Sequence, residues 1–183
     1  MDTATARLLA HYRAWQNIRM FASVAALPPG EAAKQRQTLF SSIIGTLNHN
    51  YVVDRIWQAH LSGEDHGFKA RNVILHPEFH TLWSAQQTMD CWWQDWSESQ
   101  TAASLVETVN FRFVGGKPGA MTRGAILLHV VNHVTYHQGW IAEMFHQVPA
   151  KAPATDLPVY LQELAHAGAS GAPEWDTGRV PLE

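Results

Sequence analysis

The chain has 183 residues, of which 46% are hydrophobic. This is enough for one domain with a sizeable core, and it excludes a disordered chain. The 13 lysines and arginines and the 16 acidic residues give a net charge of −3, so there is no overall basic field to hold nucleic acid. Against this low charge stand 11 histidines and 8 tryptophans, which are the unusual feature of the composition.

The sequence contains a single cysteine, Cys91, and therefore no pair that could form an intrachain disulfide. The N-terminal segment lacks the apolar core of a signal peptide, and no apolar run approaches the ~20 residues of a membrane-spanning helix. One cysteine and no such segment fit a reducing compartment. We therefore expect a cytoplasmic protein that contacts neither a membrane nor nucleic acid.

Hydrophobic residues recur at helical spacing in four long segments. These helices are expected at residues 2–27, 38–61, 77–96 and 122–147. The Pro-Pro-Gly of residues 28–30 ends the first, and Gly63 ends the second. Thr122 is a suitable N-cap for the fourth, in which Leu128 and Val131 are expected to face inward.

The segment before the fourth helix breaks the helical pattern. Residues 106–114 are rich in Val, Thr and Phe and are followed by two glycines, which predicts a short β-hairpin. A short last helix is expected at residues 157–165, ending before Gly168. The sequence thus predicts an all-α fold, a four-helix bundle with long connections, a short β-hairpin before the fourth long helix and a short C-terminal helix. Residues 1–168 would form this bundle domain and residues 169–183 a C-terminal tail.

Three histidines of the fourth helix, His129, His133 and His137, are spaced four residues apart. Neighbours at this spacing differ by about 40° in direction and about 6 Å in height, so two adjacent ones can hold one metal ion. Either adjacent pair could act with His49 of the second helix, leaving a fourth position open as in a catalytic zinc site, and the same ligands suit nickel, iron or copper. The spacing is equally compatible with a solvated stripe of histidines that binds no metal.

Other histidine patterns are weaker. His76 and His80 share the four-residue spacing, but Pro77 takes His76 out of helical geometry. No glutamate follows the first histidine of a pair as in the H-E-x-x-H pattern of zinc proteases, which disfavours peptide hydrolysis. The remaining histidines are expected at the surface or behind the site: His11, His60, His66, His146 and His166.

Three segments together resemble the DinB/YfiT-like family of bacterial damage-inducible proteins. They read IGTLNH at residues 44–49, VDRIW at 53–57 and HVVNHVTYHQG at 129–139. The resemblance implies a helical bundle with a divalent metal ion, zinc or nickel, bound by His49, His133 and His137. It also implies a homodimer, and the tryptophans of the third helix could contribute to its interface or to a pocket rim.

Some positions depart from the family pattern. Relatives commonly continue the last motif as His-Arg-Gly-Gln, whereas this chain has Gln138 and Trp140 in place of the arginine and the glutamine. The implied ligands are unaffected, and His129 would lie one turn outside the metal site. Asn48 and Asn132, each directly before a histidine of the motifs, are expected to make supporting hydrogen bonds.

The resemblance also implies activity at the metal. The ion could activate a low-molecular-weight thiol for S-transfer to an electrophilic small molecule, or it could activate water in a hydrolase. A hydrolase needs a nearby carboxylate, but Asp54 lies about 140° around the helix from His49 and is expected to pair with Arg55. We therefore expect a metal-dependent thiol S-transferase with unassigned catalytic residues. The alternatives are a metal-dependent hydrolase and a non-catalytic metal-binding stress-response protein.

Overall fold

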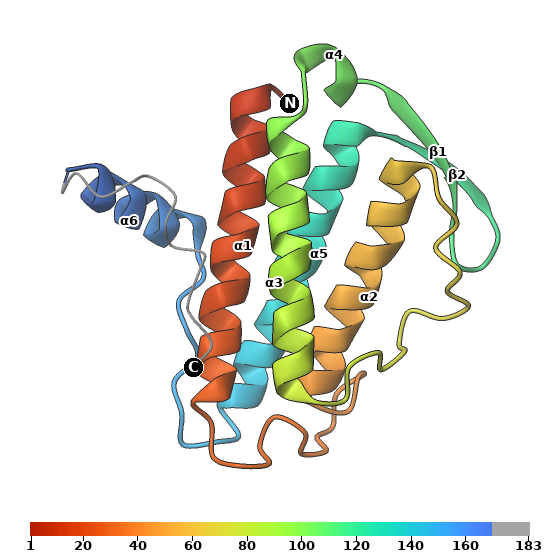
Figure 1. Ribbon diagram of the computed structural model, residues 1–183. Helices are drawn as coiled ribbons and strands as arrows, with labels where there is room; N and C mark the ends of the chain where they lie inside the picture. The colour runs from red at the N-terminus through yellow and green to blue at the C-terminus, as the bar shows by residue number, and fades with distance from the viewer. Residues whose placement is uncertain (170–183) are drawn as a thin grey trace.

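Four long helices lie side by side in the computed structural model, which describes residues 1–169 (Figure 1). They are α1 (Thr3–Ala25), α2 (Ile43–Ser62), α3 (Phe79–Glu98) and α5 (Arg123–Phe145). Both α1 and α2 pack against α3 and α5, so the apolar side chains of all four helices meet in one core. The predicted four-helix bundle is confirmed. None of the helices within residues 1–169 combines the length and the apolar character that crossing a membrane requires.

The ends of the helices follow local sequence signals. Ser42 caps α2 by accepting a hydrogen bond from the Gly45 N–H at 3.0 Å, and Gly63 ends the helix in the left-handed conformation, as predicted. The helix begins at Ile43 rather than near residue 38, because the preceding chain turns at Ser41, whose φ is 65°. At the start of α5, Thr122 acts as the predicted cap.

Gly45 allows the segment before α2 to pass close to the helix. A Cβ atom at this position would overlap the backbone carbonyl oxygen of Phe40. The close approach brings the Phe40 ring onto the imidazole of His49, with ring centroids 4.1 Å apart and an angle of 17° between the planes. A residue without a side chain therefore positions an aromatic ring against a predicted metal ligand.

We expect Gly45→Ala to lower the free energy of unfolding by about 1–3 kcal/mol, because a backbone segment must move to admit the methyl group. For a chain of this length the melting temperature would fall by roughly 2–12 °C, measured by circular dichroism. Gly139→Ala is the matched control, since Gly139 lies in α5 with open space beside its Cα and should lose no stability. A Gly45→Ala protein as stable as the wild type would contradict the close approach.

A short antiparallel hairpin precedes α5, as predicted, and lies beside α2 and α5 (Figure 1). Its strands are β1 (Thr108–Arg112) and β2 (Pro118–Thr122), preceded by the short helix α4 (Ala102–Leu105). Phe111 is the buried residue of β1 and pairs with Gly119 in the other strand. Its ring packs edge-on against Trp57 of α2, with centroids 4.8 Å apart. The hairpin thus carries aromatic side chains to the α2–α5 side of the bundle.

The C-terminal helix α6 (Leu157–Ala169) lies beside α1 (Figure 1). Tyr160 is buried against Tyr12 and Trp15, with ring centroids 5.6 and 5.3 Å apart. The predicted end before Gly168 is wrong, because a single glycine weakens a helix by only about 1 kcal/mol and does not by itself stop it. The predicted tail lies, from residue 170 onward, outside the described residues.

The buried face of α5 differs from the predicted one. Leu128 was expected to face inward and is 46% exposed. Ile126, Leu127, Val130 and Val131 are the buried residues of this part of the helix. Val131 is buried as predicted, and because α5 packs against both α1 and α2 its buried face is wide and includes Ile126 and Leu127 rather than Leu128.

A buried ionic network joins α1, α2 and α3. The Arg13 guanidinium pairs with the carboxylates of Asp54 and Asp90, and all three side chains are almost inaccessible to solvent. The expected Asp54–Arg55 pair is therefore wrong, since adjacent helical residues point about 100° apart and Arg55 donates instead to the Tyr51 hydroxyl. Burial raises the pKa of Asp90 to about 6, although the charge of Arg13 opposes the shift.

Candidate metal centre

The three histidines implied as metal ligands lie close together. His49 comes from α2, and His133 and His137 come from consecutive turns of α5. Each offers one ring nitrogen, and these atoms lie within 4.8 Å of one another. They meet because α2 packs against α5 and because residues four apart share a helix face. We call these three residues the histidine cluster, and it could hold a metal ion.

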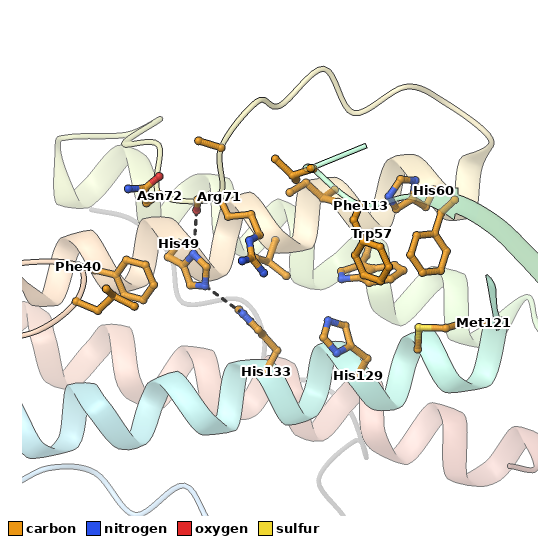
Figure 2. A pocket seen from close by; sticks show the side chains of 17 residues that line it. Phe40, His49, Trp57, His60, Arg71, Asn72, Phe113, Met121, His129 and His133 are labelled. Carbon is orange, nitrogen blue, oxygen red and sulfur yellow. Dashed lines mark hydrogen bonds between the residues drawn. The ribbon is translucent and has the colours of Figure 1, made fainter. Parts of the chain in front are cut away.

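The backbone orients the His49 ring. Its Nδ1 lies 2.8 Å from the carbonyl oxygen of Arg71, in the connection between α2 and α3 (Figure 2). A carbonyl oxygen only accepts hydrogen bonds, so Nδ1 carries the proton and donates it, and Nε2 keeps its lone pair. That lone pair faces His133, and the two Nε2 atoms are 3.1 Å apart. Histidines that bind metals are commonly held by a backbone carbonyl in this way.

The histidine cluster is neutral near pH 7. Burial lowers the pKa of His133 to about 2 and that of His137 to about 4, and repulsion from neighbouring histidines contributes to both shifts. Burial also lowers the pKa of His49. A neutral imidazole can offer a lone pair to a metal ion, whereas a protonated imidazole cannot.

The donor atoms of the histidine cluster suit a divalent cation. Three imidazole nitrogens form a ligand set that zinc and nickel accept readily. The buried Nδ1 atom of His137 has no hydrogen-bond partner within residues 1–169. A buried nitrogen left without a partner costs about 1–3 kcal/mol, which is unusual in a site that has no ligand to bind. The residues present therefore fit a metal ion.

The two positions that depart from the family pattern contact different parts of the structure, and only Trp140 packs against the histidine cluster. Gln138 is buried, and its Nε2 donates to Oδ1 of Asn17 at 3.0 Å on the α1 side of α5. Trp140 packs against His137 and Phe40, with ring centroids 4.7 and 5.9 Å away. The arginine and glutamine common in relatives are thus replaced by a core hydrogen bond and an aromatic cover.

A pocket of about 660 Å³ lies beside the histidine cluster, and His49 and His133 form part of its wall (Figure 2). The other walls come from α2, from the α2–α3 connection and from the hairpin, with Trp57, Phe111 and Phe113 as aromatic members. No aspartate or glutamate of the described chain lines the pocket. Its volume and apolar walls are typical of sites for small molecules.

The other histidines of this region take two kinds of position. His129, one turn before His133, lines the pocket and lies outside the histidine cluster, with its ring centroid 5.8 Å from that of His133. His60, expected at the surface or behind the site, also lines the pocket, and its ring centroid lies 5.2 Å from that of His66. The two rings meet because the chain after α2 returns past the helix end, and neither residue belongs to the histidine cluster.

The two asparagines that precede histidines in the motifs play different parts. Asn48 is buried, and its Oδ1 accepts hydrogen bonds from the backbone N–H groups of Leu75 and His76 at 3.0 and 2.9 Å. It therefore supports the site by anchoring the α2–α3 connection to α2. Asn132 is exposed on α5, and no hydrogen bond of its side chain to the described residues is found.

No pattern in the sequence predicts that Arg71 and Phe40 contact His49. The carbonyl of Arg71 orients His49, yet Arg71 lies in a connection without hydrophobic periodicity. Phe40 stacks on the same imidazole from the segment before α2, although it lies within the range predicted for the second helix. The close approach at Gly45 is the one local feature that could have indicated this placement.

Comparison with known proteins finds a family match over most of the chain. Residues 1–172 match the DinB family. Protein DinB of Bacillus subtilis (strain 168) is similar to the chain, with 27% identity over 160 residues, which cover 84% of this chain and 91% of that protein. The matched region contains the four long helices and all three residues of the histidine cluster. From its motifs, its fold and a match along nearly its whole length, the chain belongs to the DinB family.

Proposed function

We propose that the protein binds a divalent metal ion, zinc or nickel, through His49, His133 and His137 and catalyses S-transfer from a low-molecular-weight thiol to an electrophile. The position of the histidine cluster on the wall of a pocket carries this proposal. Structural zinc ions are usually enclosed by four protein ligands, whereas catalytic ones keep a position open. Here no fourth His, Cys, Asp or Glu of residues 1–169 joins the histidine cluster.

The composition of the pocket wall favours thiol chemistry over hydrolysis. A bound divalent cation would lower the pKa of a thiol beside it and so supply a thiolate near neutral pH. Metal-assisted hydrolysis commonly uses a carboxylate as general base, and the described lining contains none. Asp54, the carboxylate of the VDRIW segment, pairs instead with Arg13 in the core.

The side chains around the histidine cluster would orient the reactants and accept a proton. The Arg71 carbonyl keeps Nε2 of His49 directed at the site, while Phe40 covers the ring. A ring nitrogen of His129, on the pocket wall, can accept the proton that the thiol releases. The sulfur then forms a bond to the electrophilic carbon, and the leaving group departs with the electron pair of the broken bond.

The test is conjugation of glutathione, cysteine and 2-mercaptoethanol to 1-chloro-2,4-dinitrobenzene, followed by absorbance, with zinc-loaded, nickel-loaded and metal-free protein. We expect a metal-dependent rate with at least one thiol and its loss in His133→Ala. His146→Ala is the matched control, because this exposed histidine follows α5 outside the pocket. The control should keep the wild-type rate.

The absence of a metal-dependent rate with every thiol would contradict the proposed activity and favour a non-catalytic metal-binding protein. Metal binding and activity are separate outcomes, since a His133→Ala protein that retains its ion would instead contradict the ligand assignment. The homodimer and the cytoplasmic location implied by the resemblance and composition stay predictions.

A further inference from the structure

The side chain of Arg71 lies in the pocket without an acidic partner. It projects from the α2–α3 connection into the space between the histidine cluster and Trp57 (Figure 2). No carboxylate within residues 1–169 forms an ion pair with its guanidinium. The arginines of the described chain that do pair with carboxylates are Arg7, Arg13, Arg19, Arg36 and Arg123.

Arg71 is also the one permanently charged residue of the described pocket lining, which includes no lysine, aspartate or glutamate. Arg71 lines the same pocket as His49 and His133, so its positive charge lies beside the histidine cluster. Arg71 is exposed, so its guanidinium is accessible to a ligand that enters the pocket, and the apolar walls beside it lower the effective dielectric below that of bulk water. The pocket therefore presents one concentrated positive charge to an incoming ligand.

The backbone holds Arg71 in place. Its carbonyl oxygen accepts the hydrogen bond from Nδ1 of His49, and Asn48 binds the chain four residues further on through the N–H of Leu75. Both anchors come from α2. The guanidinium therefore starts from a fixed backbone position, which reduces the conformational entropy lost when it binds a ligand.

Apolar side chains line the part of the pocket next to the Arg71 guanidinium. Trp57 and Phe111 pack edge-on, and Phe111 packs edge-on against Phe113, with centroids 5.0 Å apart. At the pocket, Phe113 is 52% exposed and Leu39 is 74% exposed. Exposed apolar side chains gathered at one pocket are surface that the body of a ligand would cover.

We infer that the pocket binds an organic carboxylate whose anionic group pairs with Arg71 and whose apolar body packs against Trp57, Phe111 and Phe113. One guanidinium matches one carboxylate in charge and in forked geometry. Arg71 alone would leave the second charge of a phosphate dianion without a counter-charge, because the described lining has no other permanently charged cation. In naming the substrate class this inference rests on the proposed function, although the binding itself requires neither the metal nor the thiol.

The experiment compares 4-phenylbutyrate with its neutral amide, 4-phenylbutyramide, by isothermal titration of the full-length protein. EDTA treatment removes metal ions, so that no cation other than the protein's own can hold the carboxylate. The wild type is expected to bind the carboxylate at least about tenfold more tightly than the amide, the scale of one charge-assisted pair. Arg71→Gln should bind both equally, and Arg71→Lys should keep part of the preference.

Arg55→Gln is the charge-matched control, because Arg55 is exposed on α2 and does not line the pocket. It should retain the full preference for the carboxylate. Equal binding of the two probes to the wild type, or a preference that survives in Arg71→Gln, would overturn the inference. The titration measures binding in the absence of metal and thiol. A negative titration would therefore not count against the proposed thiol transfer, and a negative conjugation assay would not count against binding of the carboxylate.

Discussion

We expect His133→Ala to lower the metal content of the purified protein from about one divalent ion per chain to nearly none. His133 contacts both of its partners, with ring centroids 5.0 Å from His49 and 4.5 Å from His137, and the His49 and His137 centroids are 4.7 Å apart. Its loss leaves two imidazoles, which hold a divalent ion far more weakly than three. Removing a residue that only supports a ligand already costs about 10–100-fold in affinity, so losing a ligand should cost more than about 100-fold.

The matched control for this variant is His129→Ala. It removes the same side chain one helical turn away, from a residue of the pocket wall that lies outside the histidine cluster. Elemental analysis and competition with a coloured chelator measure stoichiometry and affinity for both variants. If His129→Ala also lost its ion, the alternative pair of His129 and His133 would be the correct one. Full retention of metal by His133→Ala would reject the site.

The second large effect is expected in the core. Arg13→Met should lower the free energy of unfolding by about 3–5 kcal/mol near pH 7, because it leaves Asp54 and Asp90 buried without their cation. At this chain length the melting temperature would fall by roughly 6–20 °C. Arg7→Met in the same helix is the control, since the Arg7–Glu98 pair is about half exposed and should contribute little.

The loss in Arg13→Met should shrink as the pH falls. Burial raises the pKa of Asp54 and Asp90 above the 3.8 of the unfolded chain, and removing the guanidinium raises both further. The folded variant therefore takes up protons at a higher pH than the folded wild type, in which the pKa of Asp90 is about 6, so most of the decrease in the loss falls above about pH 6. Denaturation curves near pH 7 and near pH 5 measure the difference from the wild type. An equal difference at both values would mean that the carboxylates do not cause the loss.

The local features of the fold were predictable from residues near one another in the chain. Hydrophobic spacing predicted the four long helices, and Gly63 and Thr122 marked two of their ends. Such features depend on interactions within about one helical turn, which a sequence displays directly. The predicted start of α2 and the predicted end of α6 were wrong. The chain turns at Ser41 before α2 begins, and α6 continues past Gly168.

The candidate site was predictable only in part. The four-residue spacing showed that two histidines of α5 could share an ion, but it left open which adjacent pair. Resemblance to the family implied His133 and His137, and the packing of α2 against α5 brings these two to His49 while leaving His129 on the pocket wall. Which pair meets His49 depends on the axial position of one helix against another, which no local pattern encodes.

Side-chain partners distant in the chain were decided by the tertiary structure alone. Asp54 pairs with Arg13, 41 residues away, rather than with its neighbour Arg55. The backbone of Arg71, 22 residues beyond His49, selects the tautomer of that histidine. The sequence by itself therefore determined the helices, their main caps and the candidate histidines of α5, because these follow from short-range geometry. The pocket, the buried ionic network and the cation beside the histidine cluster arise from contacts between separate elements, and only their packing decides those.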